Sequence, residues 1–307
     1  MTRITIASRL LRHLPNRTRL QQQYSSSSSF SSSSSSSSTS SSSVVITNDV
    51  ENSAIYILTL NTPTNLNAMT VDMGQGIESA VSSLSQLSPT ECKAVIITGA
   101  GRAFSAGGDV SFLDERKRDT LHNNTATMMA FYKRFLSIRT LPVPTIACIN
   151  GPAMGAGLCF AMATDIRVTH HAAKLGYTFV TLGLHPGMGG TYYTALGCNS
   201  SQVATRLLLT GDIISGAEAA ALGLVTSSHA TSELAMTESL AIARKFANQS
   251  PTAIRSTIRT IRAAQDVGLH AALLNEATEQ AASYSTKDYA EGLDALRDKR
   301  PPNFPGE

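Results

Sequence analysis

The chain has 307 residues, with 25 Lys and Arg, 22 Asp and Glu, and a formal net charge of +3. Five of the arginines lie within residues 1–24, so residues 44–307 carry 20 basic and 22 acidic side chains, a net charge of −2. This balance gives no support to binding of nucleic acid or of an anionic membrane surface. With 42% hydrophobic residues, the chain can bury a large core.

Residues 1–43 have the composition of an organelle-targeting leader. Residues 1–24 mix arginines with apolar residues and hold no acid, and residues 25–43 contain 17 serines, which cannot build a core. Such N-termini are typical of transit peptides, whereas a disordered tail with incidental arginines is the plainer alternative. We predict a transit peptide and Ser-rich linker over residues 1–43. The Arg/Leu pattern favours the mitochondrial matrix over a plastid.

Strands and helices alternate over the first two thirds of the remaining chain. Buried or alternating apolar runs predict strands at Val44–Thr47, Ala54–Leu60, Cys92–Thr98, Pro144–Asn150 and Asp165–Val168. Helical patterns occur at Val71–Leu87, Phe112–Lys117, Asn124–Ile138 and Gly155–Thr164. This alternation indicates an α/β core over residues 44–200.

Helices dominate residues 201–307. They are predicted at Gln202–Leu209, Gly216–Leu222, Ser232–Asn248 and Pro251–Asp266, and a charged helix ends near Arg297. One short strand is expected at Leu224–Thr226. We therefore predict a helical C-terminal subdomain.

Neither a membrane span nor a metal site is expected. The most apolar stretch, from Leu141 to Thr164, carries no charge but is interrupted by prolines and glycines, so it predicts a buried strand–turn–helix. The four cysteines have no paired short spacing, so neither a zinc site nor a disulfide framework is supported and free thiols are expected. The adjacent His170 and His171 would point to opposite faces of a strand and make a poor metal pair.

Two glycine-rich segments follow predicted buried strands, at 105–108 (Ser-Ala-Gly-Gly) and at 155–157 (Gly-Ala-Gly). Small residues let a substrate approach the main chain closely. The second segment opens a helix, whose first N–H groups have no partner within the helix. Two convergent backbone donors of this kind can hold an oxyanion, although either segment alone is as readily a tight turn.

Several motifs occur in an order that is typical of one family. They are Asn67-Ala68-Met69, FSAGGDV at 104–110, PTIACINGPAMGAGLCFAMATDIRV at 144–168, LGLHPGMGGTYY at 182–193 and GDIISGAEAAALGLV at 211–225. With Glu291-Gly292 and KRPPNF at 299–304, residues 44–307 resemble the enoyl-CoA hydratase/isomerase (crotonase) family. The resemblance implies a ClpP/crotonase-like spiral of ββα units, a helical trimerisation subdomain, and a homotrimer or hexamer.

The resemblance also implies an acyl-CoA thioester substrate in fatty-acid or branched-chain acyl-CoA metabolism, including β-oxidation, and a lyase or isomerase. No cofactor is expected, because coenzyme A is part of the substrate. The thioester oxygen would lie between the backbone N–H groups of Ala106 and Ala156, which would stabilise an enolate. The substrate-contacting positions implied are Asn67, Ala68, Ala106, Gly107, Gly108, Asp109, Gly155, Ala156, Gly187 and Lys299. Asp109 more simply caps the helix that follows it, and Lys299 would meet the CoA phosphates of a neighbouring subunit.

The two glutamates that the family's hydratases use to add water are missing. Counting along the motif from Ala156 places the first at Cys159, and counting 14 residues from Asp165 places the second at Phe179. No Asp or Glu lies between Asp165 and Asp212, so a shifted register cannot supply the second acid. Isomerase, hydrolase or decarboxylase chemistry is therefore favoured over standard hydration. A catalytically inactive acyl-CoA-binding pseudoenzyme or structural subunit is the alternative.

Four other side chains are candidates for acid/base work. His185 has a suitable intrinsic pKa but is as readily bonded to a neighbouring carbonyl. Tyr177 and Thr178 precede the second glutamate position. Cys159 lies near a helix start, which would lower its thiol pKa, although a small buried Cys is the more common case.

Overall fold

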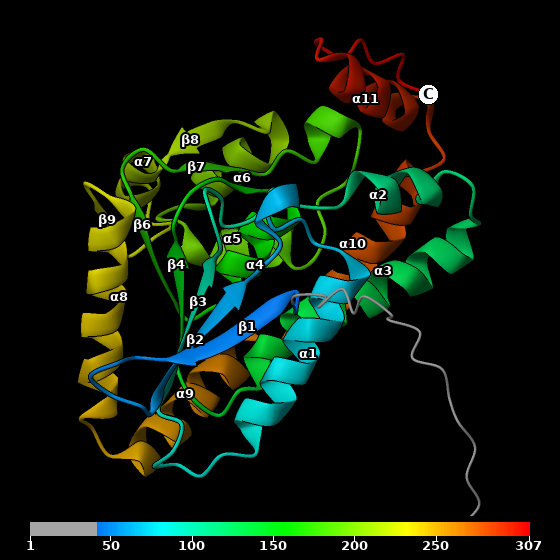
Figure 1. Cartoon of the computed structure of the whole chain (residues 1–307). Coiled ribbons are helices and arrows are strands. Elements are labelled where there is room, and N and C mark those ends of the chain that lie inside the picture. Colours follow the sequence, from blue (N-terminus) through cyan, green and yellow to red (C-terminus); the bar gives the residue numbers. More distant parts are fainter. Residues whose placement is uncertain (1–41) are drawn as a thin grey trace, which may run out of the picture. The chain divides into compact units, whose positions relative to one another are not determined.

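The computed structural model describes residues 42–307, which form two β-sheets surrounded by helices (Figure 1). The predicted leader and linker lie outside the described residues, except for Ser42 and Ser43. In this part of the chain no helix is both long and apolar enough to cross a bilayer.

The larger sheet has six strands in the order β1-β2-β3-β4-β6-β9. They are β1 (Val44–Asn48), β2 (Ile55–Leu60), β3 (Ala94–Gly99), β4 (Thr145–Ile149), β6 (Ile166–His170) and β9 (Ser227–His229). β1 and β2 pair antiparallel, and the other pairs are parallel. β3 and β4 are buried throughout, as their unbroken apolar runs require when both faces of a parallel sheet are covered.

A smaller sheet has the order β5-β7-β8, with β5 (Ala153–Met154), β7 (Lys174–Gly176) and β8 (Ile213–Ser215). β5 and β7 are parallel, and β7 and β8 are antiparallel. These strands have two or three residues each, too few to show a periodic sequence pattern. β5 connects β4 to the helix α4 (Ala156–Met162), so the small sheet fixes where that helix begins.

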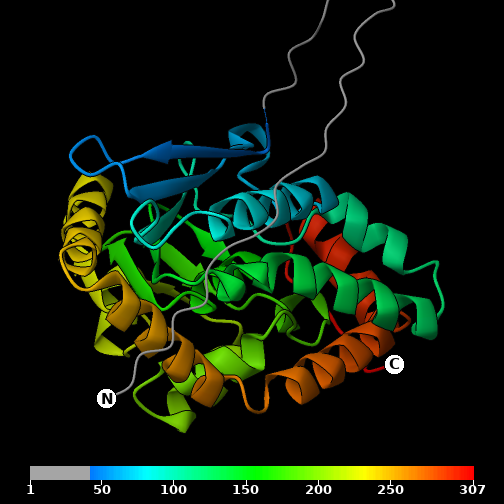
Figure 2. The same cartoon turned by 90° about the horizontal axis from the view of Figure 1, so that it is seen from below.

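Helices cover both faces of the larger sheet. One face packs against a core that includes residues of α1 (Val71–Ser85), α3 (Leu121–Leu136), α4 and α10 (Leu269–Ser283), and Figure 2 shows α10 beside α3. The other face packs against α8 (Ser232–Ala247). Alternate residues of β3 serve the two cores: Val95 and Ile97 face the first, and Ile96 faces α8.

The remaining helices are α2 (Val110–Arg116), α5 (Gly190–Gly197), α6 (Ser201–Thr210), α7 (Gly216–Ala221), α9 (Pro251–Gln265) and α11 (Lys287–Asp298). Three short 3₁₀ helices lie at η1 (Pro63–Asn65), η2 (Ser137–Thr140) and η3 (Val180–Leu182). From α8 to the C-terminus the described chain is helical apart from its connections and tail, as predicted.

One predicted strand is wrong. Leu224 and Val225 do not belong to a sheet: both backbone N–H groups donate to the Ala219 carbonyl oxygen, which closes α7, and both side chains are buried. The last strand, β9, begins at Ser227 instead. Leu224 and Val225 therefore belong to the turn that ends α7 and not to a strand. α5 and α10 were not predicted as separate helices.

Candidate active site

The two glycine-rich segments lie side by side at the end of β5. Ser105 pairs in parallel with β5, and its carbonyl oxygen accepts a hydrogen bond from the Met154 N–H at 3.0 Å. Gly107 has a φ of 95°, and a Cβ there would lie 2.6 Å from the Met154 carbonyl oxygen and 3.7 Å from the Ala156 nitrogen. A Cβ on Gly157 would lie 2.7 Å from that of Ser105. Both glycines are needed because the two main chains approach this closely.

A cavity of about 610 Å³ opens beside these segments. Of the positions named in the sequence analysis, it is lined by Ala68, Ala106, Gly107, Gly108, Asp109, Gly155, Ala156, Thr178, Phe179 and Gly187. The structure thus brings together residues that are more than 100 positions apart in the sequence. Asn67, Cys159, Tyr177, His185 and Lys299 are not part of this lining.

The two expected backbone donors differ in the structure. Ala156 is the first residue of α4, and its N–H makes no hydrogen bond with any described residue. The Ala106 N–H donates to the Leu66 carbonyl oxygen at 2.9 Å. The Ala156 N–H is therefore free to donate to a ligand in the cavity. The Ala106 N–H could donate to a ligand only by sharing or giving up its hydrogen bond to the Leu66 carbonyl oxygen.

Asn67 is buried outside the cavity lining and holds the turn that contains Leu66 in place. Leu66 and Asn67 both have a φ of 56°, a left-handed conformation that is uncommon for residues other than glycine. The fully buried Asn67 amide donates to the carbonyl oxygens of Ala100 and Ala103, each at 2.9 Å. Its side-chain oxygen accepts from the Thr62 N–H at 2.9 Å. Asn67 thus holds the turn that aims the Leu66 carbonyl at Ala106, and its side chain does not reach the cavity.

Cys159 and Phe179, at which the resemblance places the two hydratase glutamates, both lie in largely apolar surroundings. Cys159 is fully buried behind the cavity, where a Cβ on Gly190 would lie 2.9 Å from its Sγ. Burial, together with the nearby Glu276 carboxylate, raises the pKa of the Cys159 thiol well above its usual value. Of the two interpretations made from sequence, the structure agrees with a small buried Cys, since burial outweighs any lowering of the pKa by the start of α4. Phe179 lines the cavity, with ring atoms 3.9 Å from where a Cβ on Gly155 would lie.

The other acid/base candidates do not gather at the cavity. The His185 Nδ1 lies 2.6 Å from the carbonyl oxygen of Pro186, which is the plainer of the two interpretations made from sequence. Tyr177 is buried outside the lining, and burial raises its pKa well above the usual value. Thr178 does line the cavity, and its carbonyl accepts a hydrogen bond from Thr181.

Asp109 caps α2, as expected, since its Oδ1 accepts from the Phe112 N–H at 3.0 Å. It is the only carboxylate in the described lining, which contains no Glu, His, Lys or Arg. Groups of acidic, His and Cys side chains that could hold a metal are likewise absent from residues 42–307. The polarity of the cavity beside Gly107 and Ala156 therefore comes mainly from the backbone.

Comparison with known proteins identifies this arrangement. The Enoyl-CoA hydratase/isomerase family model matches residues 50–307. The chain belongs to the enoyl-CoA hydratase/isomerase family. The expected crotonase-like α/β fold with its helical C-terminal region is confirmed.

The relatives span almost all of the described chain. Mitochondrial methylglutaconyl-CoA hydratase of Mus musculus is 33% identical over 84% of this chain and 81% of its own length. The 2,3-dehydroadipyl-CoA hydratase of Escherichia coli is 31% identical over 82% of this chain and 95% of its own. A solved enoyl-CoA hydratase/isomerase from Mycobacterium paratuberculosis has a TM-score of 0.74 at 28% identity, covering 83% and 99% of the two chains.

The sequence did not predict the polar wall that α10 contributes to the 610 Å³ cavity. The Tyr132 hydroxyl donates to Gln280 Oε1 at 2.6 Å, and Gln280 Nε2 donates to the His185 carbonyl oxygen at 2.9 Å. A Cβ on Gly187 would lie 2.2 Å from the Tyr132 hydroxyl, which explains the glycine. The only signal for this wall was the helical spacing of Leu273 and Ala277 within α10.

The far wall of the cavity is apolar and aromatic. Phe112 of α2 and Phe131 of α3 stack with ring centroids 5.0 Å apart. Tyr284 donates its hydroxyl to the Met128 Sδ at 3.4 Å, so its ring also presents an apolar surface. Lys299 ends α11 with a left-handed φ of 55°, outside the lining.

Proposed function

We propose that this chain binds an acyl-CoA thioester in the 610 Å³ cavity and stabilises its enolate or oxyanion with backbone N–H groups. The observation that carries the proposal is the free Ala156 N–H beside Gly107, at the place where the two glycine segments meet. A developing negative charge on the thioester oxygen would be stabilised there by a fixed dipole. Ala106 would contribute the second donor by exchanging Leu66 for the substrate oxygen.

We infer further that standard two-glutamate hydration is lost. Hydration needs one group to take a proton from water and another to deliver a proton to carbon. Cys159 and Tyr132 keep their protons at neutral pH because burial raises the pKa of both, so neither is a base. Asp109 is engaged in capping α2. The cavity therefore suits reactions that need fewer proton transfers.

Isomerase, decarboxylase and hydrolase reactions rank ahead of hydration on this criterion. Decarboxylation forms an enolate without a base, because the electron pair of the broken C–C bond passes to the thioester. Isomerisation needs one group that removes and returns a proton, and hydrolysis needs an activated water. A non-catalytic acyl-CoA-binding protein or structural subunit is the second candidate, favoured by the burial of Cys159 and by the Phe179 ring.

The acyl group is expected to be apolar at its far end. Phe112, Phe131 and Met128 form that end, and no cationic side chain lines the described cavity to pair with a second carboxylate. The mouse and bacterial relatives are named for methylglutaconyl-CoA and dehydroadipyl-CoA, whose acyl groups carry such a carboxylate. Burying an unpaired carboxylate is unfavourable, so selectivity for uncharged acyl ends is the expected departure from these relatives.

The proposed setting is fatty-acid or branched-chain acyl-CoA metabolism in the mitochondrial matrix, with the chain as a homotrimer or hexamer. The leader composition and the mitochondrial mouse relative support this location. The function is tested by incubating the purified full-length protein with saturated, 3-enoyl, malonyl-type and hydroxyacyl-CoA thioesters. Turnover of one class supports an enzyme, tight binding without turnover supports the second candidate, and binding of none contradicts both.

A further inference from the structure

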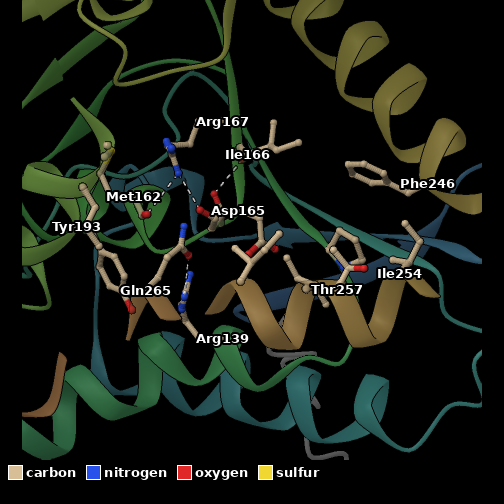
Figure 3. A pocket seen from close by; sticks show the side chains of 16 residues that line it. Arg139, Met162, Asp165, Ile166, Arg167, Tyr193, Phe246, Ile254, Thr257 and Gln265 are labelled. Atoms are coloured by element: carbon tan, nitrogen blue, oxygen red, sulfur yellow. Dashed lines mark hydrogen bonds between the residues drawn. The ribbon is translucent and has the colours of Figure 1, made fainter. Parts of the chain in front are cut away.

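A second cavity, of about 300 Å³, lies between α5, β6, α8 and α9. The 610 Å³ cavity proposed to bind acyl-CoA is called the acyl cavity. The second cavity shares no lining residue with the acyl cavity, so it is a separate site. Figure 3 shows its two ends: Arg139, Asp165, Arg167 and Gln265 gather on one side, and Phe246 and Ile254 lie on the other.

The carboxylates of the polar end are already paired. Arg262 binds Asp165 through Nε at 2.9 Å and Nη2 at 2.5 Å. Arg139 binds Asp266 through Nε at 3.1 Å and Nη2 at 2.7 Å. Each of these forked pairs satisfies one carboxylate with one guanidinium.

Arg167 is left without a carboxylate. Its Nε donates to the Leu224 carbonyl oxygen at 2.7 Å, and its Nη1 donates to the carbonyl oxygens of Thr164 and Met162 at 2.7 and 3.4 Å. Within residues 42–307 no carboxylate forms an ion pair with it, and its Nη2 makes no hydrogen bond. Three arginines and two carboxylates give the polar end a net charge of +1, with Arg167 carrying the uncompensated charge.

The desolvation of Arg167 makes this arrangement costly. Burial lowers the pKa of the Arg167 guanidinium from its usual value and outweighs the opposite influence of Tyr177 and Asp165, while the nearby Arg139 charge acts in the same direction as burial. A half-buried cation whose hydrogen bonds go only to neutral carbonyls is stabilised less than one that is hydrogen-bonded to an anion. An anion that entered the cavity would meet a guanidinium edge whose position is already fixed by three carbonyl contacts.

The opposite end of the cavity selects against a purely hydrophilic anion. Phe246 of α8 and a row along α9, Ile254, Ile258 and Ile261, supply apolar surface. The lining residues Ile261 and Leu196 are exposed in the single chain, which makes hydrocarbon accessible at this site. An amphiphile would cover that surface and gain hydrophobic free energy, whereas inorganic phosphate would not.

We propose that this cavity binds a small organic monocarboxylate, with its carboxylate on the Nη2 edge of Arg167 and its hydrocarbon tail against Phe246 and Ile254. A planar carboxylate matches the guanidinium edge, and a single negative charge matches the net charge of the polar end. The volume, half that of the acyl cavity, fits a ligand of a few carbon atoms. This site does not depend on the function proposed for the acyl cavity.

The test uses the full-length protein and sodium hexanoate, with 1-hexanol as the uncharged probe of equal chain length. Ligand-observed NMR titrations should show hexanoate binding at least about tenfold more tightly than hexanol, since a hydrogen bond to a charged group is lost in the alcohol. Two substitutions should each weaken hexanoate binding at least about tenfold: R167K, which removes the guanidinium edge, and T257E, which places a carboxylate in the lining.

Ser256→Glu is the matched control, because Ser256 is exposed on the same helix and outside the lining. It should bind hexanoate like the unaltered protein, and T257E should keep the same melting temperature. The proposal is overturned by equal binding of hexanoate and hexanol, by equal competition from inorganic phosphate, or by binding that T257E leaves unchanged. The last result would place hexanoate elsewhere, including the acyl cavity, whether or not that cavity binds thioesters.

Discussion

The two cavities obtain their polar groups in opposite ways. In the acyl cavity, polarity beside Gly107 and Ala156 comes from backbone N–H groups that a close approach of two main chains holds in place. In the α9 cavity, lined by α5, β6, α8 and α9, it comes from side chains: Arg139, which is paired with Asp266, and Arg167, which has no carboxylate partner among the described residues. Backbone donors survive substitution of most side chains, whereas a side-chain site is lost with one residue. On the function proposed here, this difference would let the acyl cavity keep its backbone donors even though Cys159 and Phe179 stand where the resemblance places the two glutamates.

The largest expected effect is a loss of stability when a buried ion pair beside the α9 cavity is broken. Arg262→Ala leaves the buried Asp165 carboxylate unpaired and removes donors to the carbonyl oxygens of Leu141 and Val143. Removing one partner of a buried ion pair typically costs about 3–5 kcal/mol of unfolding free energy. Urea titration measures this loss, with Arg259→Ala as the control, because Arg259 is exposed on the same helix. Equal stability of the two variants would show that the pair does not anchor α9.

In the acyl cavity, the corresponding test removes a backbone N–H group instead of a side chain. Ala156→Pro removes the free N–H at the first position of α4, where proline suits a helix. Loss of one oxyanion donor is expected to lower kcat about 10²–10³-fold for whichever thioester is turned over. Ala156→Gly keeps the N–H and should retain activity. Unchanged kcat in a folded A156P protein would remove Ala156 from the mechanism.

The ion pair between Asp165 and Arg262 should also make the stability of the protein depend on pH. Burial alone raises the pKa of Asp165, but the hydrogen bonds and charge of Arg262, together with Thr145, outweigh it and lower the pKa overall. The folded state then binds this proton less tightly than the unfolded state, so the stabilisation is present above the unfolded pKa of about 4. It is lost as pH falls through the lower folded value. Urea midpoints of the native protein and D165N should therefore converge below about pH 4, and a constant difference from pH 7 to 3 would contradict the pairing.

The smallest expected effect concerns the acyl group. Pentanoyl-CoA and glutaryl-CoA have acyl chains of equal length and differ in the terminal carboxylate, for which the described acyl cavity has no cation. Glutaryl-CoA should bind at least about tenfold more weakly in calorimetric titrations. Tighter binding of glutaryl-CoA would show that a cation from outside the described lining, such as Lys299 of another subunit, completes the site.

Sequence alone predicted those parts of the fold and site that depend on neighbouring residues. The apolar runs predicted β3 and β4, and the glycine segments predicted the place where Ala106 and Ala156 meet. The use of the Ala106 N–H by Leu66 could not be foreseen, because it follows from two consecutive left-handed residues.

The features that the sequence did not predict depend on contacts between residues far apart in the chain. Tyr132 meets Gln280 across 148 positions, and Arg139 meets Asp266 across 127. Neither side chain belongs to a local motif, so the α10 wall and the α9 cavity emerged only from the folded chain. Leu224–Thr226 was misjudged for a related reason, since a short apolar run does not reveal whether it closes a helix or joins a sheet.

The most direct test of the central claim is the hydration of crotonyl-CoA by the full-length protein, measured beside the hydratase activity of a relative that carries both glutamates. Loss of two acid/base groups at about 10²–10⁴-fold each predicts a kcat at least about 10⁴-fold lower, even when acyl-CoA binds. A rate within tenfold of the relative would contradict the claim, and would mean that other groups move both protons.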